Sequence, residues 1–537
     1  MSEPPDRHRY LALINKEDPP MEPWQRFWAK TNREKITDLP DDWTHPLWAH
    51  LLDVGNAALV LWERYLPAGL KRTLADGIGM NVEEGGRFLS LWIGLHDLGK
   101  AIPSFQSLHE PSAKALAGMG LTVPPDVNRL HHGHASIAVM RRLLRAHGQA
   151  DNGLLEAAAA CVGVHHGKLC ARNVWRNVSK DTIKPTGALG GPDWQAAQLD
   201  LAQRVMDAWY GIADAESRAA PWPAPDRLPP AGMRFKWPDW LMAYAGWTTL
   251  ADWLGSMQRC YPTDLPHDGD PVAYCARSRR AALNAYRRTG LQHTAGLIAR
   301  PLTEHFGAGF EPRPLQVVAR DLPLDGEPTL VIVEAPTGEG KTEAAFYLSA
   351  RHGGGIYVAM PTQATADGLH GRLLKFLTGD PEKQTFGAHR GEQAALRLVH
   401  GNDLLRDDAA ALLAVERDTF EVRDDDGSDE GLTRTLGWFL PKKRALLAAY
   451  GVGTVDQVLL GVLHARHFFL RLFALAGKTV VFDEVHSYDV YMNALFTRLL
   501  RWLRALGAHV VVLSATLPDE TRRQMLRAWG AEPSDVG

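Results

Sequence analysis

Residues 330–342 read Leu-Val-Ile-Val-Glu-Ala-Pro-Thr-Gly-Glu-Gly-Lys-Thr. The apolar, β-branched start favours a buried strand, and the glycines that follow are typical of a loop that opens a helix. In such a loop the backbone N–H groups face phosphates, the lysine reaches the β- and γ-oxygens, and the threonine hydroxyl binds Mg²⁺. The stretch therefore predicts a nucleotide site that includes Thr337, Gly338, Gly340, Lys341 and Thr342.

The rest of the second half continues this alternation of strands and helices. Apolar runs at 355–358, 479–482 and 509–513 each precede a turn and a helical segment. Runs of this kind are typical of parallel strands that are buried on both faces. We therefore predict an α/β fold with a parallel sheet for this half.

Two carboxylates directly follow the run 479–482. Asp483 suits the coordination shell of Mg²⁺, and Glu484 is placed to polarise an attacking water molecule. Together with Ser514-Ala-Thr516 and Gln316, they form an ordered set that resembles superfamily 2 helicases. The resemblance implies that Gln316 reads adenine and that Glu484 is catalytic in ATP hydrolysis.

Two further stretches, Met360–Thr365 and Gly453–Gln457, resemble the helicase motifs that grip a sugar-phosphate backbone. Such contacts carry no sequence information. Helicase lobes of this superfamily grip either polymer, so RNA stays open as a substrate beside single-stranded DNA.

The first half of the chain shows helical periodicity instead, with apolar residues at three- and four-residue spacing from about 47 to 285. Histidine nitrogens and carboxylates suit divalent metals such as iron, manganese, nickel or zinc, whereas magnesium prefers oxygen ligands. Seven residues therefore stand out as candidate ligands of transition metals: His50, His96, Asp97, His132, His165, His166 and Asp252.

Asp97 directly follows His96 in the sequence, so His96 can face one metal while the carboxylate bridges to a second. Two metals about 3.5–4 Å apart activate water and stabilise both oxygens of an in-line displacement at phosphorus. Lys100 either holds a phosphate oxygen or caps the helical segment 95–100. A single buried histidine is as often a core residue, so the prediction depends on the whole set. The neighbouring His109, His131 and His134 are expected to lie beside the site or to be exposed.

The order and contexts of these residues resemble the HD phosphohydrolase superfamily. Their contexts are similar to one branch, the CRISPR-associated helicase-nucleases of type I systems, over essentially the whole chain. The matching segments are Phe27–Lys30, Pro46–Asp53, His96–Lys100, His132–Ser136, Val164–Gly167 and Leu250–Ser256. The chain departs from the branch at His131-His132-Gly133, where similar proteins often carry Arg-His-Glu.

The resemblance also implies how the seven candidates divide. One metal would be held by His50, His96, Asp97 and Asp252, and the other by Asp97, His132, His165 and His166. We expect two divalent transition metals, namely iron, manganese, nickel or cobalt, with Asp97 and Lys100 as catalytic residues. ATP and Mg²⁺ are the cofactors expected in the second half.

We therefore expect an all-α HD nuclease domain at residues 1–285, a linker at 286–300, and a first RecA-like helicase lobe at 301–537. The implied function is ATP-coupled endonuclease cleavage of single-stranded DNA in antiviral defence. The implied partners are that strand and a guide-RNA surveillance complex of the Cascade type, which would select the target.

Superfamily 2 motors hydrolyse ATP between two lobes, and the second lobe supplies arginines. The sequence stops at Gly537, soon after Ser514-Ala-Thr516, so we expect no second lobe within it and a separate chain as its possible source. Removal of an arginine finger costs about 10³–10⁵ in rate. We therefore expect this chain to bind ATP, hydrolyse it slowly and retain nuclease activity.

Composition limits the remaining possibilities. The 59 Lys plus Arg and 62 Asp plus Glu give a net charge of −3, so nucleic acid contacts must come from local patches. The four cysteines form no C-x-x-C pair. The amino terminus lacks an export signal, and no apolar run reaches about 18 residues. These features predict a cytoplasmic protein without membrane contact.

Two other functions stay open. One is an HD phosphohydrolase that acts on free nucleotides and is regulated by its ATP site. The other is an ATP-switched adaptor that docks onto a ribonucleoprotein complex and whose metal cluster is structural. A pure adaptor has no chemical need of Asp483, Glu484, Lys341 or the seven candidate ligands. Their presence together argues against that function.

Overall fold

The computed structural model describes most of the chain. The described residues are 21–32, 39–124 without 41, 130–149, 153–167 without 164, 188–211, 222, 237–289 without 266 and 268, 291, 297–362, 369–377 without 370 and 374, 396–399, 446–463 and 465–531. No helix among them is long and apolar enough to cross a membrane.

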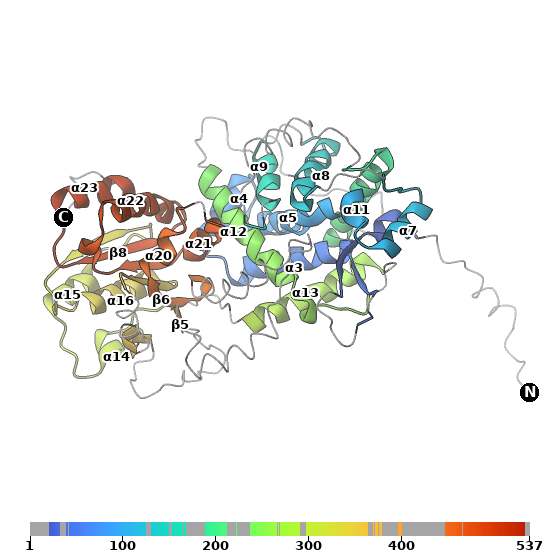
Figure 1. Cartoon of the computed structure of the whole chain (residues 1–537). Helices are drawn as coiled ribbons and strands as arrows, with labels where there is room; N and C mark the ends of the chain where they lie inside the picture. The colour runs from blue at the N-terminus through green and yellow to red at the C-terminus, as the bar shows by residue number, and fades with distance from the viewer. Residues whose placement is uncertain are drawn as a thin grey trace, which may run out of the picture.

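The first domain is a bundle of helices around α3 (Leu47–Arg64), whose residues are nearly all buried (Figure 1). Three helices pack most extensively against it, α5 (Val82–Gly94), α12 (Trp237–Gly255) and α13 (Pro271–Thr289). The remaining helices of this domain are α2 (Pro23–Arg26), α4 (Ala68–Gly77), η1 (Leu95–Lys100), α6 (Pro103–Gln106), α7 (Glu110–Gly118), α8 (His132–Ala146), α9 (Gly153–Val162), α11 (Pro192–Tyr210) and η4 (Gln258–Cys260). A short antiparallel pair, β1 (Trp28–Thr31) and β2 (Thr44–Pro46), completes it.

The second half forms a six-stranded sheet in the order β3-β8-β7-β4-β6-β5, and every neighbouring pair is parallel. Its strands are β3 (Leu330–Glu334), β4 (Ile356–Met360), β5 (Leu396–Val399), β6 (Tyr450–Thr454), β7 (Thr479–Phe482) and β8 (His509–Ser514). The four predicted strands are confirmed. The sequence did not predict β6, because Gly451 and Gly453 interrupt its apolar pattern. The predicted fold class, a helical domain followed by an α/β lobe with a parallel sheet, is confirmed.

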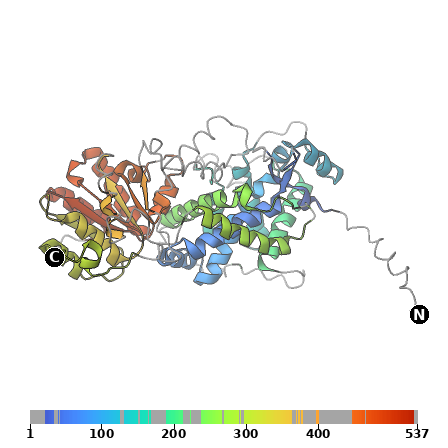
Figure 2. The ribbon, with the colours of Figure 1, turned by 90° about the horizontal axis from the view of Figure 1, so that it is seen from below.

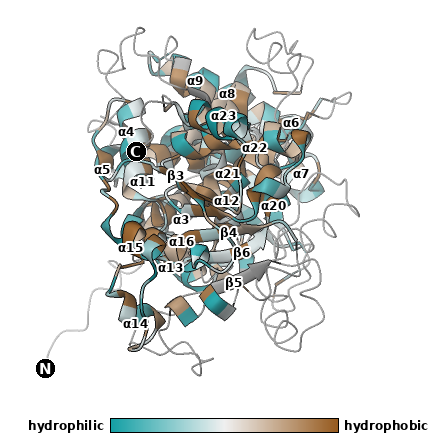
Figure 3. Ribbon diagram, turned by 90° about the vertical axis from the view of Figure 1, so that its left-hand side faces the viewer, coloured by the Kyte–Doolittle hydropathy of each residue, from teal (hydrophilic) through white to brown (hydrophobic). Residues whose placement is uncertain are grey.

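Alternate residues of the strands face different layers, as the two-residue period of a strand requires. Val481 and Val511 belong to a core shared with α16, whereas Val480 and Val510 belong to the core shared with α22. Figure 2 shows helices on both faces of the sheet, and Figure 3 shows polar residues on the outer helix α23. The helices of this half are α14 (Leu302–Phe306), α15 (Pro314–Asp321), α16 (Lys341–His352), α20 (Val455–Leu459), α21 (Phe468–Leu475), η6 (Val485–Ser487), α22 (Val490–Ala505) and α23 (Asp519–Trp529).

The two halves share one apolar core, because α21 packs along α12. Phe469 and Phe473 of α21 are fully or almost fully buried, and burying one phenylalanine contributes about 1.5–3 kcal/mol. The close approach requires glycine at position 246, where an added Cβ would lie 2.3 Å from the Cβ of Phe473. Tyr65 also donates a hydrogen bond to the Leu447 carbonyl across the contact, at 2.9 Å. The helical domain and the lobe are therefore packed as one body.

Candidate metal centre and nucleotide site

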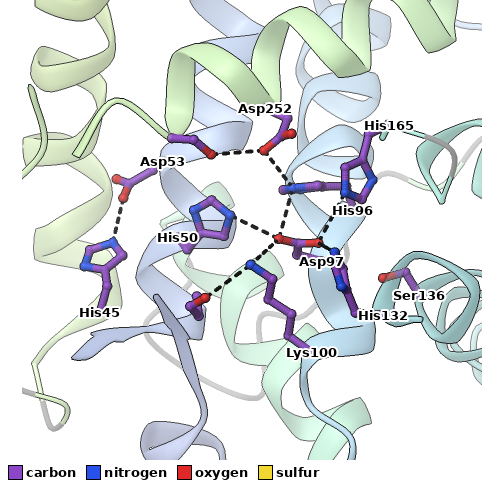
Figure 4. Close-up of polar contacts among 12 residues, drawn as sticks. His45, His50, Asp53, His96, Asp97, Lys100, His132, Ser136, His165 and Asp252 are labelled. Atoms are coloured by element: carbon purple, nitrogen blue, oxygen red, sulfur yellow. Dashed lines mark hydrogen bonds and ion pairs between the residues drawn. The ribbon is translucent and has the colours of Figure 1, made fainter. Parts of the chain in front are cut away.

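The seven candidate ligands come from separate elements that meet in the middle of the helical domain. His50 lies on α3, Asp252 on α12, and His132 is the first residue of α8. His165 and His166 follow α9. The pair His96-Asp97 lies in η1, a 3-10 helix that continues directly from α5. Figure 4 shows six of the seven, with His50, His96, His132 and His165 around Asp97 and Asp252 beside His96.

Asp97 has φ −105° and ψ 17°, which are not helical values. The regular helical segment expected at 95–100 is therefore replaced by a tighter 3-10 turn that is distorted at Asp97. Gly99 allows this turn to press against α8, since its N–H donates to Ser136 Oγ at 2.8 Å. The distortion places the carboxylate between two groups of histidines.

The first group faces Asp97 Oδ2. His50 Nε2 lies 3.2 Å and His96 Nε2 3.3 Å from this oxygen. Asp252 Oδ1 lies 3.3 Å from His96 Nε2. Two atoms that bind one metal at about 2.0–2.1 Å stand roughly 3.0–3.4 Å apart, so these separations fit one shared ion.

The second group faces the other oxygen, Asp97 Oδ1. His132 Nε2 and His165 Nε2 each lie 3.6 Å from it, and His166 Nε2 lies 2.7 Å from His132 Nε2. One carboxylate thus presents one oxygen to each group, as a carboxylate that bridges two ions does. The structure brings together all seven residues singled out in the sequence.

Two buried atoms that face the other candidate ligands, His96 Nε2 and Asp97 Oδ1, have no hydrogen-bond partner among the described residues. A buried polar atom without a partner costs about 1–3 kcal/mol. Both atoms point to where the groups converge, and bound cations would satisfy them. The donor set, five imidazoles with two carboxylates, suits a divalent transition metal.

The electrostatics also favour bound cations. Burial lowers the pKa of His50 and His132 well below the ordinary value and, together with His166, lowers that of His165 to about 3. These imidazoles are therefore neutral, which is the form that binds metals. Burial opposes protonation of His96 too, but Asp97 and Asp252 outweigh it and raise its pKa to about 10. The two carboxylates attract positive charge to this position.

Lys100 is also buried, and its ammonium lies 3.1 Å from Asp97 Oδ2 while donating to the Ala29 carbonyl at 3.2 Å. Its positive charge, together with that of His96, keeps the pKa of Asp97 well below its usual range although burial acts to raise it. The side chain points into the metal centre.

His131 lies close enough to His132 and His166 to share a metal with them, but its chemistry argues for another role. Its Nδ1 accepts the N–H of Gly133 at 3.1 Å and caps α8. A neutral imidazole that accepts at Nδ1 carries its proton on Nε2. His131 therefore supports the start of α8, in keeping with its expected place beside the site. His109 bonds Ser112 on α7, away from the centre.

Sequence reasoning missed the groups that support the ligands. Asp53, one turn after His50 on α3, is buried and accepts hydrogen bonds from Tyr274 at 2.9 Å and Ser278 at 2.7 Å. His45 Nε2 lies 2.9 Å from the same carboxylate. These contacts fix α3 against α13 and so fix His50. The three-residue spacing between His50 and Asp53 was the available signal.

The nucleotide site lies at the carboxyl ends of β3 and β7. Gly338 has φ +93° and Gly340 φ +77°, a backbone that only glycine adopts easily. Lys341 begins α16, and its ammonium donates to the carbonyls of Ala335 at 2.6 Å and Pro336 at 3.1 Å. Gln316 is buried against the loop, with Nε2 3.4 Å from the Gly340 carbonyl. Thr337 lies in the loop and Thr342 follows Lys341 in the first turn of α16.

Asp483 and Glu484 lie at the end of β7, beside this loop. Burial raises the pKa of Asp483, and the charge of Glu484 raises it further. Glu484 has φ +54°, a strained value for a residue with a side chain. Its carboxylate lies 3.2 Å from His486 Nδ1, which lies 3.3 Å from Ser514 Oγ. The predicted motifs are therefore in contact, except that 363–365 of Met360–Thr365 lie outside the described residues.

The fold and the two candidate sites define a class of protein, a histidine–aspartate (HD) domain with a candidate metal centre joined to an α/β lobe with a phosphate-binding-loop motif. Residues 28–261 match the family model described as the HD domain of Cas3. The chain belongs to the Cas3 family of CRISPR-associated nuclease/helicases.

Its similarity to curated relatives extends well beyond the metal domain. The chain is 36% identical over 498 residues to the CRISPR-associated endonuclease/helicase Cas3 of Thermus thermophilus. This match covers 91% of this chain and 50% of that protein. It is 28% identical over 540 residues to the nuclease/helicase Cas3 of Streptococcus thermophilus, covering 94% and 53%. The chain thus spans about half the length of the curated relatives it matches.

Solved structures give the same result. The crystal structure of T. fusca Cas3 superposes with a TM-score of 0.72 at 30% identity, covering 96% of this chain and 53% of that one. A chain from a CRISPR RNA-guided surveillance complex, described as pre-nicking, has a TM-score of 0.61 at 29% identity, covering 94% and 49%.

Proposed function

We propose that this chain is a metal-dependent endonuclease that cuts single-stranded DNA, with an ATP-binding lobe that helps to feed the strand. The gathering of five histidines and Asp252 around Asp97, with four of the histidines against its two oxygens, carries the proposal. The helical domain packs against a lobe with helicase motifs, and this favours a polymeric substrate. The names of its relatives, endonuclease/helicase and nuclease/helicase, support the same reaction.

In this proposal His50, His96, Asp97 and Asp252 would hold one ion, and Asp97 with the second group would hold the other. When bound, two such ions polarise the phosphodiester and make water acidic enough to attack phosphorus. Lys100 offsets the negative charge of the carboxylates, which would otherwise repel the phosphodiester. Because His50, His132 and His165 are buried and neutral, they are ready to bind metal without first losing a proton.

In the lobe, Lys341 and Thr342 would bind the phosphates of ATP, and Asp483 would complete the shell of Mg²⁺. Glu484 would orient the attacking water, and Gln316 would read adenine. The Glu484–His486–Ser514 contacts link the carboxylate pair to the strand β8. Structures of T. fusca Cas3 carry ATP, ADP and AMPPNP in their descriptions, which supports a nucleotide here. Slow ATP hydrolysis by these 537 residues alone and a cytoplasmic setting stay predictions.

We also propose a guide-RNA surveillance complex as the partner that selects the target. The similarity to a chain solved within such a complex supports this partner. DNA rather than RNA is proposed as the strand because the relatives' complex is described as pre-nicking, which fits cleavage of one strand of a duplex.

The test is nicking of circular single-stranded DNA by the purified chain with Mn²⁺, Ni²⁺ or EDTA, beside Asp97→Ala. We expect metal-dependent nicking that falls at least about 10³-fold in the variant, because several kcal/mol of transition-state stabilisation are lost. Binding of a fluorescent ATP analogue should be unchanged. Equal nicking by both proteins would contradict the proposal, and hydrolysis of free nucleotides without nicking would favour a nucleotide phosphohydrolase.

A further inference from the structure

The lobe contacts the metal centre directly, through the turn that precedes α21. The guanidinium of Arg466 donates its Nε–H to the carbonyl of His166 at 3.0 Å. The N–H of His467 donates to the carbonyl of Gly167 at 2.9 Å. Two consecutive residues of the lobe thus bind two consecutive carbonyls of the segment that carries the candidate ligands His165 and His166.

This contact is closely fitted. Gly167 has φ +88°, and a Cβ added there would lie 2.4 Å from the ring of His467. His467 itself has φ +56° and is buried. Its ring also meets Trp253 edge to face, with centroids 5.5 Å apart, directly beside the ligand Asp252. The turn therefore contacts the metal centre on two sides.

The turn is held firmly at its other end. Arg471, one turn further along α21, donates to the carbonyl of Gln457 at 3.2 Å and to its side-chain oxygen at 2.9 Å. Arg471 is buried. Because α21 is also packed along α12, the residues before it form a fixed platform beside the metal centre.

The two adjacent ligands are positioned differently. His165 is fixed within its own domain, because its Nδ1–H donates to the Val162 carbonyl at 2.7 Å and its carbonyl accepts from Thr249 at 3.2 Å. His166 follows the end of α9 by four residues, and the lobe holds its carbonyl. The helical domain thus orients the first histidine of the pair, and Arg466 of the lobe helps to orient the second.

We propose that Arg466 is a positioning residue for His166, so that the ATP-binding lobe completes the second group of metal ligands. The inference rests on the proposed metal-binding role of that group and does not depend on which substrate is cut. Groups that orient metal ligands typically contribute about 10–100-fold to metal affinity.

The experiment is a calorimetric titration of the metal-free chain with Mn²⁺, and separately with Ni²⁺, for wild type, Arg466→Ala and Arg466→Lys. We expect Arg466→Ala to bind one ion about 10–100-fold more weakly and the other as wild type does. Arg466→Lys keeps a donor and should recover part of the loss. Wild-type affinity for the other ion, together with a wild-type thermal unfolding curve, shows that the variant is folded.

The matched control is Tyr65→Phe, which removes another hydrogen bond between the two halves, from Tyr65 to the Leu447 carbonyl. Both ions should bind this variant with wild-type affinity. Wild-type metal binding by Arg466→Ala, or equal weakening by Tyr65→Phe, would overturn the inference. A wild-type chain that binds neither ion would overturn the proposed function as well, whereas one that binds both but leaves DNA intact would overturn only the function.

Discussion

The metal centre and the nucleotide site are built in opposite ways. The metal centre gathers buried and half-buried side chains from α3, η1, α8, α12 and the segment after α9, and its charges are largely balanced inside the protein. The nucleotide site comes from short continuous motifs at strand ends, and Glu484 is 38% exposed. The first site therefore depends on how helices pack, and the second on local backbone conformation. Substitutions that alter packing should separate the two sites.

The largest effect is expected from Gly99→Ala. The new Cβ would lie 2.0 Å from the His132 carbonyl oxygen and 2.3 Å from the Ser136 nitrogen, so η1 and α8 must move apart. Displacement of catalytic groups by about 1 Å costs roughly 10²-fold in rate, and we expect a loss of at least this size in nicking assays. ATP-analogue binding should persist. Gly118→Ala, where a Cβ meets nothing within 4 Å, is the control; equal loss there would contradict the packing argument.

Lys341→Ala should do the reverse, impairing the nucleotide site and sparing the metal centre. Charge-assisted hydrogen bonds contribute about 1.5–3 kcal/mol, so the affinity for an ATP analogue should fall about 10- to 100-fold in equilibrium titrations. Metal content and metal affinity should stay at wild-type values, because the ammonium of Lys341 bonds Ala335 and Pro336 of its own loop. Lys114→Ala removes an exposed lysine that pairs with Glu110 on its own helix, and provides the charge-matched control. Loss of bound metal in Lys341→Ala would show that the two sites are not separable.

The smallest effect is a pH dependence of stability that comes from a neutral histidine outside the metal centre. Burial, with His509 and Arg351, lowers the pKa of His352 to about 3, and its ring stacks on that of His509. Below the ordinary value of 6.5 the unfolded chain binds the proton more readily. Stability is therefore full above about pH 6.5 and falls as the pH drops towards 3.

We expect His352→Gln to flatten this dependence in denaturant titrations of the metal-free chain between pH 7 and 5. Added Mn²⁺ should not change the contribution of His352, whereas it should stabilise the metal centre by binding the native state alone. An identical pH slope in the variant and wild type would show that His352 is not a source of the dependence.

The same contrast explains how much the sequence could predict. The nucleotide site follows from residues 330–342 alone, since a strand, a glycine loop and a helix lie in one continuous stretch. Helical periodicity identifies apolar faces but not which helices meet, so the grouping of His50 with Asp252 had to come from family resemblance. The distortion at Asp97, the support from Asp53 and the contact of Arg466 with His166 depend on packing between distant segments. The strand β6 was hidden by its glycines.

The shared core also has a consequence for how the chain is made. Domains generally fold in order of synthesis, from the amino terminus. Here the apolar face of α12 finds its partner α21 only after the greater part of the lobe has been translated, because α21 lies far downstream. A nascent chain that has completed its helical bundle therefore still exposes the apolar face of α12 while it is on the ribosome. Exposed apolar surface of this kind makes a chain prone to aggregation until Phe469 and Phe473 cover it.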